Sequence, residues 1–370
     1  VHIMKFNKIS KKLAACSLAG VMMVSMMGMS VCAAGGVTGG TEDSPITSVP
    51  VNKTVSAAEN TYAPNTTFTF TVTSAGSTTI KDKEGKSVAV KAGVDGGLKY
   101  DKGATFAPDT NAATSTTYTP TDANKASLKT DASQFTEPGI YHYTVSEDDG
   151  KYEGIVYDTT VYDVYVYVSA KLDENKNATS VMYVSGVVSA KSGDGEIAKS
   201  DLEFNNVYDG VHKVTVTKKV QGGFATAGDT FKFNVTVNGA TGEVYKVAYT
   251  TKSVQTTTHV ASGDTIEVEL GKDDTVIIYG LSATDSYTIT EQGITNGKTA
   301  TGYTVTDTCG GNDGKVEGMG GTADASYTIT NTKEAVTPTG IAMTVAPYIL
   351  MVAVAGIFAI LFLRRRHEEA

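Results

Sequence analysis

The chain has no tryptophan and only three cysteines. Cys16 and Cys32 lie in an amino-terminal stretch with the features of a secretory signal, so only Cys309 remains in the exported part of the chain. A single cysteine excludes an internal disulfide. An exported chain without disulfides must obtain its durability in some other way.

The sequence also lacks the patterns that mark metal sites and enzymes. Its five histidines are scattered along the chain, without the paired spacing of metal ligands. No Ser/His/Asp signature and no phosphate-binding loop is present. We therefore expect no cofactor, no metal site and no enzymatic turnover.

Positive charge is scarce in the body of the chain. The formal net charge of the whole sequence is −9. The amino-terminal segment contributes four lysines, and the segment beyond Thr339 contributes three arginines and two glutamates, which leaves −9 − 4 − 1 = −14 for the rest. Such an acidic body repels nucleic acids and anionic membranes. Neither is expected as a partner.

Long apolar runs are confined to the two ends. Four lysines precede an apolar stretch over 13–31, and small residues follow it, so residues 1–34 read as a secretory signal peptide. An uncharged run over 341–363 is long enough for a transmembrane helix. The arginine-rich tail 364–370 is expected to stay in the cytoplasm, which places the preceding residues outside the cell.

Between these ends the composition is typical of β-sheets. Thr, Val, Tyr and Gly dominate, and polar and apolar residues alternate clearly in 159–168 and 213–218. No window outside the two apolar ends shows helical periodicity. Turn-rich segments separate many short strands. The pattern predicts two all-β domains, each an antiparallel β-sandwich, over 35–208 and 209–335, with the connection at 208–210.

The two halves share a loose repeat in which three polar residues have the inward-facing parity of their apolar strand neighbours. In each half a Val-x-Lys strand is followed by a Phe-x-Phe strand, then by a strand ending in glutamate and a last strand bearing asparagine. The selected residues are Lys53, Glu147 and Asn206 in the first half and Lys218, Glu291 and Asn331 in the second. For any one of these residues, the alternative is that it lies at the end of a strand, where parity no longer decides whether a side chain is buried. The repetition of the same triplet favours burial.

Burial gives such a triplet a specific chemistry. Desolvation disfavours charge, so a buried lysine becomes a neutral amine nucleophile and a buried glutamate stays protonated. The acid can hydrogen-bond the asparagine carboxamide, polarise its carbon and carry a proton to departing ammonia. The triplets therefore predict an intramolecular Lys–Asn amide in each half, with Glu147 and Glu291 as the catalytic groups.

A short motif precedes the carboxy-terminal apolar run. Residues 336–340, Val-Thr-Pro-Thr-Gly, resemble the LPXTG-like sorting signal of Gram-positive surface proteins, with Thr337 where that motif has leucine. In those proteins a sortase, a cysteine transpeptidase, cuts between the threonine and the glycine. The resemblance implies that the cut lies between Thr339 and Gly340.

The whole secreted chain is similar to the major (backbone) pilins of Gram-positive bacteria, of the streptococcal T-antigen type. Residues 340–349 follow that family's segment after the motif, and Asp158-Thr159-Thr160 with its alternating strand resembles the pattern of the family's amino-terminal domain. The resemblance implies two tandem immunoglobulin-like domains, each with a self-formed isopeptide bond between its first and last strands. By motif the bonds are Lys53–Asn206 with Glu147 and Lys218–Asn331 with Glu291.

The same resemblance implies a polymer. The family pattern puts the linking lysine seven residues before the first-domain asparagine, which is Lys199. Lys191 is the closest rival, and an ordinary solvated lysine beside a glycine-rich turn is the alternative. The implied partners are a pilin-specific class C-type sortase, neighbouring copies joined head to tail, a tip adhesin and a basal pilin, with peptidoglycan bound indirectly. The competing hypothesis is a monomeric, sortase-anchored cell-wall adhesin with ligand-binding β-sandwich domains.

Overall fold

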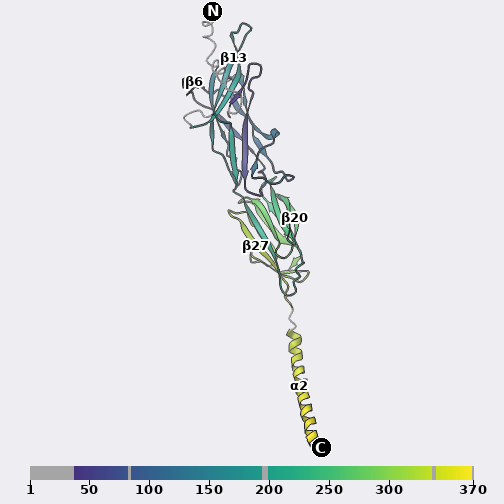
Figure 1. Ribbon diagram of the computed structural model, residues 1–370. Helices are drawn as coiled ribbons and strands as arrows, with labels where there is room; N and C mark the ends of the chain where they lie inside the picture. The colour runs from purple at the N-terminus through teal and green to yellow at the C-terminus, as the bar shows by residue number, and fades with distance from the viewer. Residues whose placement is uncertain (1–36, 82–84, 194–198, 336–338, 369–370) are drawn as a thin grey trace, which may run out of the picture.

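The computed structural model describes residues 37–81, 85–193, 199–335 and 339–368. Two β domains follow one another along an elongated molecule, and a helix comes last (Figure 1). The predicted all-β fold with two tandem sandwiches is confirmed. The predicted signal peptide, 1–34, lies outside the described residues.

The first domain contains two large sheets and a separate pair of short strands. A seven-stranded sheet has the order β1-β14-β13-β11-β6-β5, with β4 also paired to β11. A six-stranded sheet has the order β12-β15-β2-β10-β7, with β9 also paired to β2, and β3 pairs with β8. The elements are β1 (Val37–Gly39), β2 (Ser48–Ala57), β3 (Thr66–Phe68), β4 (Phe70–Ser74), β5 (Thr78–Lys81), β6 (Ser87–Ala92), β7 (Leu98–Lys102), β8 (Ala104–Phe106), β9 (Thr117–Tyr118), η1 (Asp122–Asn124), β10 (Ala126–Thr130), η2 (Ala132–Gln134), β11 (Gly139–Glu147), β12 (Ile155–Val156), β13 (Val161–Leu172), β14 (Ala178–Lys191) and β15 (Glu203–Tyr208).

The second domain is a simpler sandwich. An eight-stranded sheet has the order β19-β18-β21-β16-β27-β25-β24-β23, and a four-stranded sheet has the order β20-β17-β22-β26. The strands are β16 (His212–Gln221), β17 (Phe231–Asn238), β18 (Val244–Thr251), β19 (Val254–Ala261), β20 (Thr265–Leu270), β21 (Thr275–Leu281), β22 (Ser286–Glu291), β23 (Ile294–Thr295), β24 (Lys298–Thr299), β25 (Thr304–Asp307), β26 (Lys315–Met319) and β27 (Ala325–Thr332).

In both domains the first long strand and the last strand are parallel neighbours. β2 pairs with β15 over six residues, with Lys53 opposite Phe204, and β16 pairs with β27 over eight residues. Parallel strands need a long connection, and here that connection is nearly the whole domain. The start and the end of each domain therefore lie side by side in one sheet.

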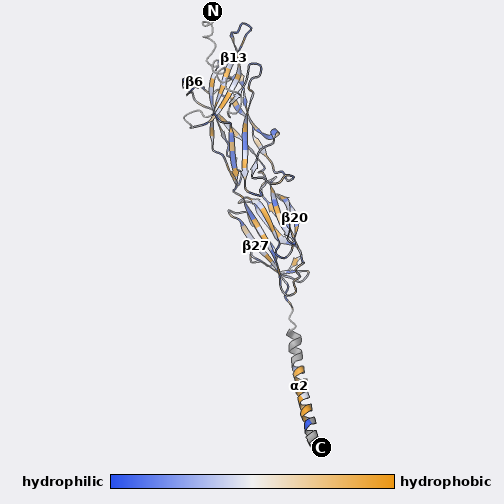
Figure 2. Cartoon of the chain, in the orientation of Figure 1, coloured by the Kyte–Doolittle hydropathy of each residue, from blue (hydrophilic) through white to orange (hydrophobic). Residues whose placement is uncertain are grey.

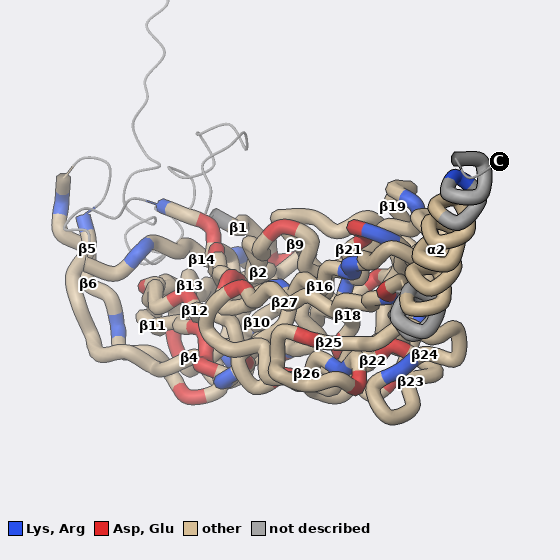
Figure 3. The backbone as a smooth tube through the Cα atoms, turned by 90° about the horizontal axis from the view of Figure 1, so that it is seen from below, with Lys and Arg blue, Asp and Glu red and all other residues tan. Residues whose placement is uncertain are grey.

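Alternation along the strands separates core from surface. Hydrophobic residues are interspersed with hydrophilic ones along the strands (Figure 2), and acidic and basic residues are interspersed around both domains (Figure 3). The inward residues form one core in the first domain, including Val51, Tyr143 and Phe204, and another in the second, including Phe233 and Ile289. Each fully buried side chain of this kind contributes about 1.5–3 kcal/mol.

Polar contacts join the two domains. Tyr152 donates its hydroxyl to Glu243 Oε1 at 2.7 Å, and the Thr284 main-chain N–H donates to Glu153 Oε1 at 3.0 Å. Further bonds run from Asn65 Nδ2 to the Thr241 carbonyl and from Lys246 Nζ to Asn60 Oδ1. The segment that connects β15 to the second domain is thus accompanied by several hydrogen bonds between the two domains.

The carboxy-terminal element is helix α2 (Thr339–Glu368), which contains Pro347. Its described side chains, including Tyr348 and Phe358, are exposed. Within the described residues no helix has a long enough apolar stretch to cross a membrane. Residues 336–338 of the predicted sorting motif lie outside the described residues. Several side chains of 341–363 and of the tail also lie outside them, so those segments stay predictions.

Candidate functional site

Lys53, Glu147 and Asn206, the first triad, meet inside the first domain. Lys53 is in the middle of β2, and its Nζ lies 2.9 Å from Glu147 Oε1 and 3.0 Å from Oε2. Asn206, on the neighbouring β15, donates its Nδ2 to Glu147 Oε1 at 2.9 Å. The Lys53 and Glu147 side chains have no solvent exposure. One carboxyl group therefore holds both the amine and the carboxamide.

Burial changes the protonation of this pair. It lowers the pKa of Lys53 to about 8, against the opposing effect of Glu147, and raises the pKa of the Glu147 carboxyl. Both shifts favour the neutral forms, a free amine and a carboxylic acid. These are the forms that a nucleophile and a proton carrier require.

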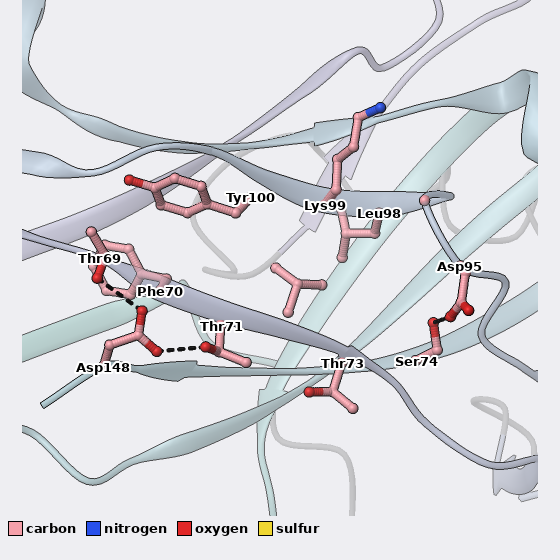
Figure 4. A pocket seen from close by; sticks show the side chains of 12 residues that line it. Thr69, Phe70, Thr71, Thr73, Ser74, Asp95, Leu98, Lys99, Tyr100 and Asp148 are labelled. Atoms are coloured by element: carbon pink, nitrogen blue, oxygen red, sulfur yellow. Dashed lines mark hydrogen bonds between the residues drawn. The ribbon is translucent and has the colours of Figure 1, made fainter.

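Glu147 owes its position to the end of its strand. It is the last residue of β11 and lies opposite Phe70 of β4. The next residue, Asp148, accepts hydrogen bonds from the hydroxyls of Thr69 at 2.8 Å and Thr71 at 2.5 Å, on the wall of a groove of about 560 Å³ (Figure 4). These bonds hold the end of β11 against β4, and this fixes the position of the Glu147 carboxyl group.

Lys218, Glu291 and Asn331, the second triad, repeat this geometry in the second domain. Lys218 Nζ lies 2.6 Å from Glu291 Oε2, and Asn331 Nδ2 donates to Glu291 Oε1 at 2.5 Å. The side chains of Lys218 and Glu291 are fully buried. Burial lowers the pKa of Lys218 to about 8, against the opposing effect of Glu291.

The Phe-x-Phe strand serves both triads in the same way. In each domain the first phenylalanine lies near the amine: Lys53 Nζ is 4.8 Å from the Phe68 ring centroid, and Lys218 Nζ is 4.4 Å from that of Phe231. The second phenylalanine pairs across the ladder with the glutamate, Phe70 with Glu147 and Phe233 with Glu291. The repeated pattern therefore places one aromatic ring beside the lysine amine. It also pairs the other phenylalanine with the glutamate, which fixes the position of the carboxyl group.

A glycine allows Glu291 to approach the neighbouring loop. The Glu291 main-chain N–H donates to the Gly314 carbonyl at 2.9 Å. Gly314 has φ +67°, and a Cβ there would lie 3.1 Å from the Glu291 Cβ. A larger residue at this position would combine backbone strain with crowding of the Glu291 Cβ.

Asp158 belongs to the first site although parity did not select it. Its main-chain N–H donates to Asn206 Oδ1 at 2.8 Å. Its carboxylate accepts from the main-chain N–H groups of Thr160 and Asn205, each at 2.8 Å. Only the Asp158-Thr159-Thr160 motif marked this segment in the sequence, and strand parity does not apply in a loop.

The two candidate linking lysines are next to each other at the edge of the seven-stranded sheet. Lys199 forms an isolated antiparallel bridge with Ala190 and is half-buried. Lys191 is the last residue of β14 and is exposed. Thr339 and Gly340 begin α2. The structure does not bring these residues together within one chain.

No cluster of three or more metal-binding side chains occurs in the ranges that the structure describes. Cys309 is exposed and is the free cysteine of this part of the chain. The groove of Figure 4 contains none of the triad residues. The groove therefore lies apart from the two buried triads.

Both domains match known family models. Residues 49–209 match the Spy0128-like isopeptide containing domain, and residues 212–333 match a family described as a domain of unknown function. A pilin of Streptococcus pyogenes serotype M1 is 30% identical over 278 residues, which cover 69% of this chain and 77% of that protein.

Solved structures show the same fold. The major pilin protein T3.2 of Streptococcus pyogenes matches with a TM-score of 0.54 and 20% identity, over 80% of this chain and 99% of that one. The major pilin protein T-13 of the same species matches with a TM-score of 0.52 and 23% identity, over 81% and 99%. With 30% identity across most of the serotype M1 pilin, the chain belongs to the streptococcal major pilin family.

Proposed function

We propose that this protein is the major structural subunit of a covalent cell-surface pilus, in which each domain is closed by a self-formed Lys–Asn isopeptide bond. The observation that carries the proposal is the pair of buried triads, in which one carboxyl group contacts both the lysine amine and the asparagine carboxamide. Membership of the pilin family supports the assembly into a pilus.

The reaction is an exchange of amide nitrogens. The neutral Nζ of Lys53 attacks Cγ of Asn206, and the new C–N bond forms as a proton leaves Nζ for Glu147. Glu147 delivers a proton to Nδ2, the Cγ–Nδ2 bond breaks, and ammonia departs. Lys218, Glu291 and Asn331 would do the same in the second domain. No oxidant or cofactor is needed, and each triad reacts once.

The pH dependence of bond formation follows from the shared proton. A neutral amine with a carboxylic acid holds as many protons as an ammonium with a carboxylate, so the rate is flat while the pair keeps one proton. Below the raised pKa of Glu147 the pair gains a second proton and the nucleophile is lost. Above about pH 8 the pair loses its shared proton, and no acid remains to assist ammonia.

We therefore expect a bell-shaped pH profile for ammonia loss in the first domain. Chain extracted unfolded from inclusion bodies is refolded by dilution at a series of pH values, quenched in acid, and analysed by peptide mass. Glu147→Gln, which keeps the shape of the side chain, serves as the unreactive control. A rate that kept rising with pH above the pKa of Lys53 would argue against a role for the acid.

The ends of the chain fit export and covalent assembly. Residues 1–34 would direct secretion, and the domains 35–208 and 209–335 would be displayed outside the cell. Residues 336–340 would be cut by a pilin-specific class C-type sortase between Thr339 and Gly340, while 341–363 and 364–370 hold the precursor in the membrane. A tip adhesin and a basal pilin complete the fibre, and the basal pilin attaches it to peptidoglycan.

Lys199 is the proposed amine that forms an amide with Thr339 of the next copy. Such a head-to-tail linkage does not close on itself, so it produces an open-ended fibre. Co-expression with the cognate pilin sortase should give a ladder of polymers on denaturing gels. Lys199→Ala should leave only the monomer, because the acyl-enzyme has no amine to attack it, whereas Lys191→Ala should keep the ladder.

A ladder that survives Lys199→Ala and disappears with Lys191→Ala would move the linkage to the rival lysine. A wild-type chain that reaches the wall only as a monomer would instead support the monomeric adhesin. Intact mass of the same preparations keeps these outcomes separate from the internal bonds, because the ammonia losses do not depend on polymerisation.

A further inference from the structure

The oxygen of the reacting carboxamide has a different environment in each domain. Asn206 Oδ1 accepts a hydrogen bond from the Asp158 main-chain N–H at 2.8 Å. Asn331 Oδ1 is also buried, but no donor within the described residues reaches it. Buried polar atoms without a partner are uncommon in native folds. The difference distinguishes two triads that otherwise match closely.

We infer that the Asp158 main-chain N–H is an oxyanion donor for bond formation in the first domain, and that the second domain forms its bond without this donor. The inference rests on the proposed self-crosslinking reaction. It assigns a catalytic group to the loop between β12 and β13, which carries neither the nucleophile nor the acid.

The donor acts on the oxygen at which charge develops. When Nζ of Lys53 attacks Cγ, the carbonyl electron pair moves to Oδ1, which becomes an alkoxide. A main-chain N–H already 2.8 Å from this oxygen stabilises the charge without reorganisation. When the intermediate collapses, the C=O bond re-forms, the Cγ–Nδ2 bond breaks, and ammonia leaves with the proton from Glu147. The N–H donor is unchanged at the end.

The Asp158 carboxylate positions its own main-chain N–H. One oxygen accepts from the Thr160 N–H, which fixes the loop on the side of β13, and the other accepts from the Asn205 N–H, which fixes it to β15. Asn205 is the residue before the reacting asparagine. The loop is therefore tied to the same strand that presents the carbonyl, and the donor moves with it.

The consequence is an order of closure. Removal of one oxyanion donor typically slows an acyl-transfer reaction by roughly 100- to 1000-fold. With similar nucleophiles and acids in both domains, the first domain should lose ammonia earlier than the second after folding. Folding rates also differ between domains, so a variant that changes the donor alone is needed.

An amide-to-ester replacement at Asp158 provides that variant. The full chain is made by cell-free translation with the α-hydroxy analogue of aspartate at this position, which removes the N–H and keeps the carboxylate. It is unfolded at once in guanidinium, refolded by dilution, quenched at intervals and mapped by peptide mass. Ammonia loss in the first domain should slow roughly 100- to 1000-fold, with an unchanged pH profile, while the second domain keeps its wild-type rate.

Two side-chain variants distinguish the role of the Asp158 N–H from that of the carboxylate that positions it. Asp158→Asn keeps the main-chain N–H and one accepting oxygen but loses the other, so one of the two loop contacts is lost and the first domain should slow less than in Asp158→Ala. Asp158→Ala leaves the loop untied and should slow the first domain alone. These variants also test the inference if the ester chain does not fold.

The outcomes distinguish this inference from the proposed function. Absence of ammonia loss in both domains of the wild type would overturn the self-crosslinking proposal itself. Normal ammonia loss in the wild type, together with wild-type rates in the folded ester chain, would overturn only the role of the Asp158 N–H. If the ester chain does not fold, a wild-type first-domain rate in Asp158→Ala would overturn the part of the inference in which the Asp158 carboxylate holds the N–H donor in place.

Discussion

A chain carrying both Glu147→Ala and Glu291→Ala is expected to have the full mass calculated from its sequence, whereas the wild type should be lighter by two ammonia molecules. Each single variant should be lighter by one. The reason is that each carboxyl group contacts both partners of its own triad and neither partner of the other. Intact mass spectrometry of residues 35–335 measures this directly.

The double variant should also be far less stable. The proposed bonds would close loops of 206 − 53 = 153 and 331 − 218 = 113 residue steps. On the chain-entropy account of cross-links, each loop of this size restricts the unfolded state by roughly 5 kcal/mol. Denaturant unfolding should show two large decreases, one for each domain.

Alanine also leaves a cavity and an unpaired buried lysine, so its effect on stability exceeds the loss of the bond. Glu147→Gln and Glu291→Gln are the matched controls, because they keep the side-chain volume and remove the acid. If the glutamine variants retained the mass deficit, proton transfer by the glutamates would be wrong. A full sequence mass for the wild type would refute both bonds.

Much of the site was accessible from the sequence because strands impose a period of two. Lys53 and Lys218 have the parity of buried valines, and the structure buries both side chains. The asparagine was selected over its neighbour in the same way: Asn206 is buried, whereas Asn205 is exposed. Parity is a local property, so it can be read without knowing which strands are neighbours.

Features that depend on non-local packing could not be predicted. The outer face of β13 reads as a second apolar stripe, and Tyr165 and Tyr167 on it are buried in a small core with Val88 and Val90 of β6. Only the return of the β5–β6 hairpin onto this sheet explains that burial. The contact between the Asp158 N–H and Asn206 likewise arises from a loop, to which no periodicity applies.

The route of mechanical load through the subunit follows from the parallel pairing of first and last strands. In the proposed fibre, tension enters at Lys199 and leaves at Thr339. It passes along β15 into β16, reaches Lys218, crosses the isopeptide bond to Asn331 and leaves along the end of β27. The 113 residue steps between Lys218 and Asn331 carry no load. The first-domain bond lies beside this path, because Lys199 and Asn206 are already joined by a short stretch of chain.

Single-molecule pulling should therefore give unequal effects for the two glutamates. Handles are attached through Lys199→Cys and Ala335→Cys, with the exposed Cys309 changed to serine. The otherwise wild-type chain should not extend by domain unfolding. Glu291→Ala should extend by roughly 370–400 Å when the second domain unfolds, since each released residue spans about 3.3–3.6 Å. Glu147→Ala should add almost nothing in this geometry.

Moving the first handle supplies the reciprocal control. With the handle at Val37, tension must cross the first domain, and Glu147→Ala should now release about 500–550 Å from its 153 residue steps. If Glu147→Ala released this length with the handle at position 199, β15 would not carry the load as described. If the otherwise wild-type chain released the length of the second domain in either geometry, no covalent bond would join β16 to β27. In the proposed fibre the two bonds would thus have different tasks: the second-domain bond would bear tension, and the first-domain bond would protect a domain beside the load path.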